Sequence, residues 1–205
     1  MEDIDFHFIP PEDLVPFNSK FIIDLGCNDG MTTEVYAERF PQALVLGVEL
    51  VKHVSDEAAR RVSKYIPRVL ILNEAIGWPE GKSIAHIDNC SSVSTLTPYQ
   101  GRPTTPVQVN VRSLDTILKD IGMDNFIIDF VKIDIEGAEL LLFSGGNKWF
   151  DRTRCFIVEC HSEEAIEIYS NLEKFTVKPL FSNPKFGNHL IALNHSDLPL
   201  GTLYI

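Results

Sequence analysis

Residues 21–30 read FIIDLGCNDG, an apolar run followed by two glycines that are separated by three residues. The run from Phe21 to Leu25 predicts a buried strand of a parallel sheet, because such strands are covered on both faces. A glycine at the end of a strand adopts backbone angles closed to other residues and lets a ligand approach the main chain. The N–H groups at the start of a helix, expected from Met31, favour a carboxylate or a phosphate. The stretch therefore predicts a ligand-binding turn between a first strand and a first helix.

Strand and helix patterns alternate after this turn. Apolar runs at 44–48 and 69–72 predict two further strands, and segments 31–39 and 52–65 have helical patterns. Such alternation is typical of a parallel sheet with helices on both faces. The pattern resumes in the second half of the chain, where we expect helix 114–120 capped by Ser113, strand 130–135, a helix from about 137, strand 155–160 and helix 163–172.

The C-terminal part predicts a change of strand direction. Apolar runs at 176–180 and 189–193 are joined by a loop that is too short for a crossover helix, so the two strands must be antiparallel. We therefore expect an α/β fold with an irregular lead-in at 1–20 and one Rossmann-like domain at 21–205. Its sheet should be mainly parallel and seven-stranded, and it should end in an antiparallel hairpin.

The middle of the chain is less regular. Segment 78–106 holds four prolines, and a short alternating pattern around 83–87 predicts an inserted loop or hairpin. Long irregular segments in compact domains tend to be functional. We expect residues 88–106, the loop at 181–188, the lead-in or another subunit to recognise a substrate.

Composition argues against several classes of protein. The chain has 29 acidic and 18 basic residues, and its net charge of −11 repels a polyanion, so nucleic acid is not an expected substrate. No apolar run approaches the roughly 20 residues of a membrane helix, and the N-terminus lacks the order of a secretory signal. We therefore expect a cytoplasmic protein without a membrane span.

The cysteines form no C-x-x-C pair and are expected to be small buried hydrophobes: Cys27, Cys90, Cys155 and Cys160.

Glu49 stands directly after the second expected strand, 19 positions after Gly30. An acidic group there can accept hydrogen bonds from the ribose hydroxyls of a nucleoside. The alternative is a solvent-exposed glutamate, but the glycine turn makes ribose binding the better interpretation. Glu74, Ala75 and Ile76 follow the third strand, where an adenine ring would then lie. The Gly-x-x-x-Gly spacing departs from the Gly-x-Gly-x-x-Gly of dinucleotide sites and argues against NAD.

Residues 131–139 read VKIDIEGAE, with three acidic residues near the end of the fourth main strand. Ligands in open α/β sheets bind beyond the carboxyl ends of the strands, so this segment and the glycine turn should face one crevice. The segment KIDIEGAEL resembles the signature of the FkbM-type methyltransferases, S-adenosylmethionine-dependent O-methyltransferases that act on sugars and polyketides. Other motifs agree with that family in order and spacing between about 21 and 161: DLGCNDG at 24–30, AIG at 75–77, SS at 91–92, RSLD at 112–115 and IVECH at 157–161.

The resemblance implies roles for individual residues. Four residues of the turn would hold the amino-acid end of S-adenosylmethionine: Asp24, Gly26, Asn28 and Gly30. Glu49 would bind the ribose, and Asp134 would stand beside the reactive sulfonium. Methyl transfer is an in-line displacement that needs the acceptor oxygen within about 3–3.5 Å of the methyl carbon. The candidates for a base that takes the proton of the acceptor are Asp134, Glu136 and His161.

Several alternatives stay open at this point. His161 could instead cap or stack near the helix expected from Glu163. Asp134, Glu159 and His161, with Glu136 nearby, could hold Mg²⁺ or Mn²⁺, because carboxylates suit hard cations, although our first expectation is no metal. The pair His86-x-Asp88 is too sparse to indicate a second metal site.

Other functions also remain open. The chain could be a catalytically silent, methyltransferase-like module that binds a partner protein, or a nicotinamide-dependent oxidoreductase. The leading hypothesis is an O-methyltransferase whose acceptor is a hydroxyl of a sugar, a glycan or a related small molecule. An uncovered crevice would also be compatible with a homodimer.

Overall fold

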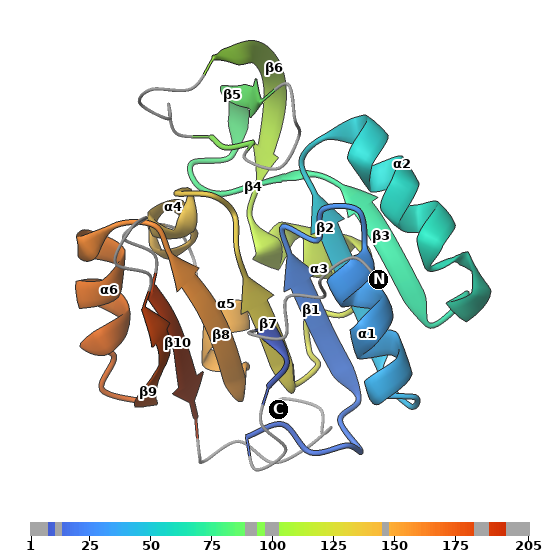
Figure 1. The fold of residues 1–205 in the computed structure, drawn as a ribbon, viewed down its shortest axis with the longest axis vertical. Helices are drawn as coiled ribbons and strands as arrows, with labels where there is room; N and C mark the ends of the chain where they lie inside the picture. Colours follow the sequence, from blue (N-terminus) through green and yellow to red (C-terminus); the bar gives the residue numbers. More distant parts are fainter. Residues whose placement is uncertain are drawn as a thin grey trace.

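A seven-stranded sheet forms the centre of the protein (Figure 1). The computed structural model describes residues 8–10, 14–88, 94–96, 103–144, 148–182 and 189–195. The strands lie in the order β3 (Val69–Asn73), β2 (Leu44–Glu49), β1 (Phe21–Leu25), β7 (Phe130–Ile133), β8 (Cys155–Cys160), β10 (His189–Asn194) and β9 (Thr176–Ser182). The first five of these are parallel, and β10 runs antiparallel to both of its neighbours. The predicted α/β fold with a terminal antiparallel hairpin is therefore confirmed.

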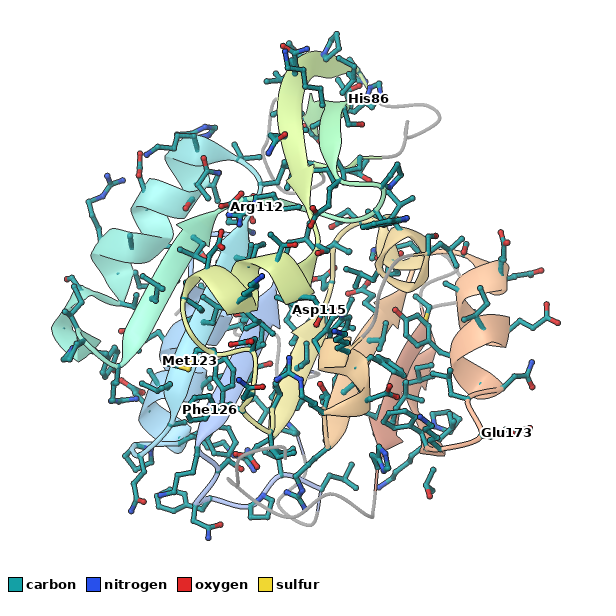
Figure 2. All side chains as sticks on the ribbon, turned by 180° about the vertical axis from the view of Figure 1, so that it is seen from behind. His86, Arg112, Asp115, Met123, Phe126 and Glu173 are labelled. Carbon is teal, nitrogen blue, oxygen red and sulfur yellow. The ribbon has the colours of Figure 1, made fainter. Side chains whose placement is uncertain are left out.

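Helices cover both faces of this sheet, because successive side chains of a buried strand point to opposite sides. On one face, Ile22 of β1 packs in a cluster with Tyr36 and Phe40, which belong to α1 (Met31–Arg39) or directly follow it. On the other face, Ile23 belongs to a larger cluster that includes Leu114. That cluster also takes side chains from α3 (Leu114–Asp120), α4 (Glu139–Phe143), α5 (Lys148–Asp151) and α6 (Glu163–Ser170). Figures 1 and 2, seen from opposite sides, show α1 in front of the sheet and α3 behind it.

A second, three-stranded sheet projects beyond the carboxyl ends of the parallel strands (Figure 1). It consists of β4 (Ala75–Ile76), β6 (Thr104–Arg112) and β5 (Gly81–Asp88), with β6 in the middle. The hairpin expected around 83–87 is confirmed, but its second strand was not predicted. Three valines of β6 alternate with polar residues, but Pro106 lies next to this pattern and argues against a strand. His86 lies on this sheet (Figure 2) and pairs through its backbone with Thr95.

Several predicted boundaries were wrong by a few residues. β7 ends at Ile133, two residues early, because the chain turns there into a loop that carries acidic side chains. The helix expected at 52–65 is α2 (Lys52–Arg61) followed by the 3₁₀ helix η2 (Ser63–Tyr65). The helix expected to end at 172 ends at Ser170.

The RSLD motif at 112–115 has structural contacts. The guanidinium of Arg112 pairs with Glu74 at 2.9 Å, where the small sheet joins the main body (Figure 2). Ser113 caps α3 by accepting a hydrogen bond from the N–H of Thr116, as predicted. Asp115 accepts hydrogen bonds from the N–H groups of Lys148 and Trp149, at the start of α5.

The described part of the lead-in packs against the sheet. Phe8 and Val15 are buried beside α1, and the hydroxyl of Tyr36 donates a hydrogen bond to the carbonyl of Phe8. The three described cysteines are buried and free, as predicted: Cys27, Cys155 and Cys160. Cys90 and the SS motif at 91–92 lie outside the described residues. Among the helices that the structure describes, none combines the length and the apolar character needed to span a bilayer.

Candidate functional site

A pocket opens at the carboxyl ends of β1, β2 and β7, on the side of the small sheet. Its walls come from the glycine turn, the end of β2, β4, the segment 94–96 and the loop after β7. Seven of the nine residues predicted to bind a cofactor line this pocket: Gly26, Asn28, Glu49, Glu74, Ala75, Ile76 and Asp134. The predicted crevice therefore exists, and it brings together residues more than 100 positions apart in the chain.

The turn after β1 requires glycine at Gly26. Its φ is 73°, and a side chain there would collide with the backbone carbonyl oxygen of Asp134. The glycine turn and the loop after β7 are thus in direct contact along one wall of the pocket. Gly30 has a φ of 84°, but a Cβ there would meet the Cα of Ala58 at 2.9 Å. Gly30 therefore allows α1 and α2 to pack closely and does not line the pocket.

Glu49 is fixed by backbone hydrogen bonds at the end of β2. One carboxylate oxygen accepts from the N–H of Asn28 at 3.0 Å, and the other accepts from the N–H of Val51 at 2.8 Å. Burial raises the pKa of Glu49 above its ordinary value, and these two hydrogen bonds act in the opposite direction. Each carboxylate oxygen keeps a second lone pair, so Glu49 can still accept a hydrogen bond from a ligand.

Lys132 is a buried cation beneath the same wall, and the sequence reading gave it no role. Its ammonium lies 3.3 Å from a carboxylate oxygen of Asp24 and 3.3 Å from one of Asp134, and it donates a hydrogen bond to the carbonyl of Gly26 at 2.6 Å. The ring of Phe8 lies 4.9 Å from the ammonium. Burial on its own would lower the pKa of Lys132, but Asp24 and Asp134 hold it above its ordinary value. Asp24 is fully buried, so it supports the wall from behind and does not line the pocket.

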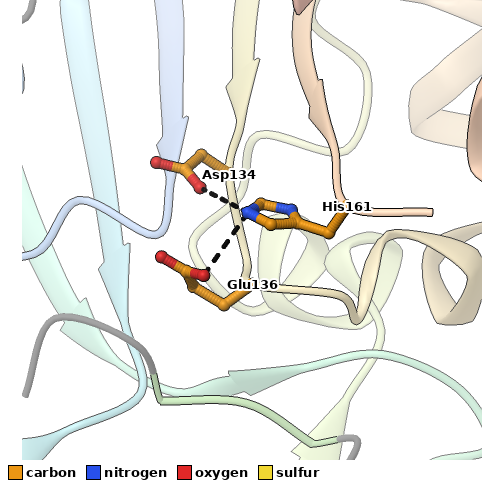
Figure 3. Close-up of side chains that lie close together, drawn as sticks. All are labelled: Asp134, Glu136 and His161. Atoms are coloured by element: carbon orange, nitrogen blue, oxygen red, sulfur yellow. Dashed lines mark ion pairs between the residues drawn. The ribbon is translucent and has the colours of Figure 1, made fainter. Parts of the chain in front are cut away.

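His161 follows β8 and lies among four carboxylates. Its Nδ1 is 2.8 Å from Glu139, and its Nε2 is 3.3 Å from Glu136, 3.8 Å from Glu159 and 4.0 Å from Asp134. Figure 3 shows Asp134 and Glu136 converging on one nitrogen of the ring. The structure therefore brings together the three residues predicted to supply a base, and it places His161 beside the pocket-lining Asp134 and Glu136.

The surroundings of His161 stabilise its charged form. Burial on its own would lower the pKa of His161, but the hydrogen bonds to Glu136 and Glu139 raise it to about 11. A protonated imidazole has no lone pair with which to accept a proton. Asp134 and Glu136 are therefore better suited than His161 to act as the base, and His161 is suited to donate a hydrogen bond.

The same cluster bears on the question of a metal. Asp134, Glu136 and His161 each offer a ligand atom within 4.8 Å of the other two. The possible metal site considered from the sequence also contained Glu159, which is not part of this group. Three carboxylates around Nε2 call for a positive charge, which either a proton or a divalent cation would supply.

The wall expected for adenine is built where the two sheets meet. β4 pairs with β6 through Ala75 and Ile76, and Glu74 forms an ion pair with Arg112. One oxygen of the Glu74 carboxylate pairs with the guanidinium, so its other oxygen, backbone groups and Ile76 are the candidates for contacts to a ring.

The segment 94–96 lies within the region 88–106 that was expected to recognise a substrate, but its residues Ser94, Thr95 and Leu96, which line the pocket, were not singled out. Thr95 is held by two backbone hydrogen bonds to His86 of β5, at 2.8 and 3.2 Å. A single bridge between an irregular segment and a hairpin leaves no periodic signal in a sequence. Within the described residues, Ser94 Oγ and Asp134 Oδ1 are buried atoms without a hydrogen-bond partner, and both belong to pocket-lining residues. Such atoms are suited to meet a ligand.

Residues 24–181 match the model of the methyltransferase FkbM domain. The matched region contains all the cofactor and base residues predicted above, from Asp24 to His161.

A curated relative and two solved structures are similar to this chain. The 2-O-methyltransferase NoeI of Sinorhizobium fredii (strain NBRC 101917 / NGR234) is 24% identical over 161 residues, which are 71% of this chain and 65% of NoeI. The chain therefore spans just under two thirds of the length of that relative.

M. capricolum TrmK in complex with S-adenosylhomocysteine matches with a TM-score of 0.52 and 10% identity over 88% of this chain and 64% of TrmK. Precorrin-6y C5,15-methyltransferase from Geobacter metallireducens GS-15 matches with a TM-score of 0.51 and 10% identity over 94% of this chain and 96% of that enzyme. At such identities these two structures show that the fold is shared.

Proposed function

Because the chain belongs to the FkbM methyltransferase family, we propose that it is an S-adenosylmethionine-dependent O-methyltransferase. The proposed acceptor is a hydroxyl of a sugar, a glycan or a related small molecule. The observation that carries the proposal is the single pocket in which Gly26, Glu49 and Asp134 line neighbouring walls. A backbone turn that lines the pocket, an acceptor for ribose and a carboxylate for a cation are the groups that this cofactor requires.

The charges of the pocket support a cationic ligand. Glu49, Glu74, Asp134 and Glu136 all line it, whereas the cations that pair with some of them do not: Lys132, His161 and Arg112. S-adenosylmethionine, when bound, supplies a methyl group on a positively charged sulfur. Carboxylates facing that sulfur would stabilise the bound cation, because opposite charges attract more strongly in a water-poor pocket than in bulk water.

The residues around Asp134 can supply the rest of the chemistry. The acceptor hydroxyl must be held in line with the methyl group, form a C–O bond and give up its proton. Asp134 or Glu136 would accept that proton, and the charged Nε2–H of His161 would hold the acceptor by a hydrogen bond. The products are the methyl ether and S-adenosylhomocysteine, so atoms and charges balance without an oxidant or reductant.

The acidic wall also favours an uncharged acceptor. A phosphate or carboxylate on the acceptor would be repelled by Asp134, Glu136 and Glu159, whereas neutral hydroxyls can donate hydrogen bonds to them. The description of NoeI as a 2-O-methyltransferase supports oxygen as the methylated atom.

Two experiments test the proposal in turn. Titration calorimetry with S-adenosylhomocysteine should show saturable binding, and the absence of heat at high ligand concentration would contradict it. Mass spectrometry of candidate glycans incubated with the protein and S-adenosylmethionine should then show the gain of one methyl group. The second reaction is also run with and without EDTA. It decides whether the positive charge among the carboxylates is the proton of His161 or a bound metal, because only a metal-dependent reaction stops with the chelator.

A further inference from the structure

Glu139 occupies a place in the site that neither the pocket nor the proposed chemistry accounts for. It begins α4, it is 1% exposed, and it does not line the pocket. A carboxylate buried to this extent is costly unless hydrogen bonds and opposite charges compensate for the loss of water. Its Oε1 accepts a hydrogen bond from the backbone N–H of Gly137 at 3.0 Å and lies 2.8 Å from Nδ1 of His161. One oxygen atom thus contacts two parts of the site, the loop after β7 and the imidazole of His161.

The first of these parts is the loop between β7 and α4, which carries Asp134 and Glu136. Glu136 has a φ of 55° and Gly137 a φ of 90°. A residue other than glycine in this left-handed region costs on the order of 1 kcal/mol or more, so the surrounding structure must hold it there. The hydrogen bond from Gly137 to Glu139 fixes the loop at the next residue. Glu139 therefore helps to keep the carboxylate of Glu136 directed at the pocket.

The second part is the imidazole of His161. With Nδ1 held by Glu139, the ring presents Nε2 to Glu136, Glu159 and Asp134. Without a partner at Nδ1, the ring could rotate and present either nitrogen to the pocket-lining carboxylates. Glu139 thus selects both the orientation of the ring and the nitrogen that faces the pocket-lining carboxylates.

We propose that Glu139 is a positioning residue that acts through His161 and the Glu136 loop, holding an imidazole N–H and two carboxylates around the place of the acceptor oxygen. This inference rests on the proposed function of the same site, because it assigns the arrangement to the transfer step. Among the described residues, the hydrogen bonds of the Glu139 carboxylate go to Gly137 and His161, neither of which lines the cofactor pocket.

Two substitutions at this position test the inference. Glu139→Gln keeps an oxygen that can accept from Gly137 and His161 but removes the charge, whereas Glu139→Ala removes both contacts. We expect kcat to fall about tenfold in the first variant and about a hundredfold or more in the second, with the affinity for S-adenosylhomocysteine changed by no more than about twofold in either. Glu167→Gln, at an exposed position of α6, is the matched control and should leave kcat and affinity unchanged.

A readout that needs no acceptor comes from NMR of the ¹⁵N-labelled histidine ring. In the wild type, Nδ1 of His161 should carry a proton that is hydrogen-bonded to a carboxylate, and this signature should weaken in Glu139→Gln and disappear in Glu139→Ala. An unchanged kcat in Glu139→Gln, or a ring signal that is the same in all three proteins, would overturn the inference. So would equal losses of kcat and cofactor affinity, because they would indicate a general structural role.

The two proposals fail in different ways. If the wild type binds S-adenosylhomocysteine but methylates no acceptor, the proposed function fails, while the ring signal still decides the positioning. If Glu139→Ala does not fold, Glu139→Gln carries the test, since it has nearly the same size and keeps both acceptor contacts.

Discussion

The two ends of the pocket hold their carboxylates in different ways. At the end that we propose to hold the nucleoside, called the nucleoside end and formed by Gly26, Asn28 and Glu49, the carboxylate is held by neutral backbone N–H groups. At the acidic end, formed by Asp134, Glu136 and His161, the carboxylates face the charged groups of Lys132 and His161. Backbone N–H groups fix a position and leave the charge of the carboxylate for a ligand, whereas buried cations balance that charge before any ligand arrives. The first arrangement suits recognition of a ribose, and the second suits control of protons during a reaction.

Asp134→Ala should give the largest effect and affect the acidic end alone. Removal of a group that accepts a proton in the transition state lowers kcat by about 10²–10⁴-fold. The affinity for S-adenosylhomocysteine, measured by calorimetry, should change far less. Asp124→Ala, at an exposed loop position, is the control. A variant that loses kcat and affinity to the same degree would remove the distinction between the two ends.

Lys132→Met should show how strongly the acidic end depends on its buried cation. The variant leaves Asp24 and Asp134 without their ammonium, and removal of one partner of a buried ion pair costs about 3–5 kcal/mol of stability. Urea denaturation followed by circular dichroism measures the change in the free energy of unfolding. Lys119→Met, on the exposed side of α3, should stay close to the wild type, and a similarly small change in Lys132→Met would contradict the expected role.

Glu49→Ala should act mainly at the nucleoside end. Loss of the ribose acceptor, together with two backbone hydrogen bonds, should weaken binding of S-adenosylhomocysteine by about 10–100-fold. At saturating cofactor, kcat should stay within about threefold of the wild type. Glu57→Ala, exposed on α2, is the matched control. A kcat that falls as far as the affinity would show that Glu49 also serves the reaction.

The charge on His161 predicts a pH dependence of stability. Its pKa in the folded protein is raised to about 11, above the ordinary value of 6.5, so its contribution to stability is complete below about pH 6.5 and is lost as the pH rises towards 11. Within this window the wild type should lose stability relative to His161→Gln by about 1.4 kcal/mol per pH unit. Urea denaturation of both proteins between pH 7 and 10, with EDTA present, measures the difference. Parallel curves would mean that His161 is neutral in the folded state.

Much of the nucleoside end could be predicted because its parts are local in the chain. An apolar strand, a glycine turn and an acidic residue after the next strand lie within 21–49, and each leaves a pattern in a short window. Gly30 shows the limit of such reasoning, because the same residue type that lets a ligand approach also lets α1 pack on α2. A motif alone does not distinguish these two uses.

The residues of the acidic end were predicted, but the contacts that hold them in place were not. Asp134, Glu136 and His161 stand where strands end, so parallel-sheet topology alone places them together. The contacts of Lys132 with Asp24 and of Glu139 with His161 join residues 108 and 22 positions apart through side-chain orientations. Strand β6 was missed although Val107, Val109 and Val111 alternate with polar residues, because Pro106 interrupts the pattern near its start.

A crystal structure of the protein soaked with S-adenosylhomocysteine would test the two-ended pocket most directly. We expect the ribose hydroxyls within hydrogen-bonding distance of Glu49, the amino-acid end beside Gly26 and Asn28, and the sulfur on the side of Asp134. A pocket that stays empty at saturating ligand, or a ligand bound with its ribose away from Glu49, would contradict the proposed function.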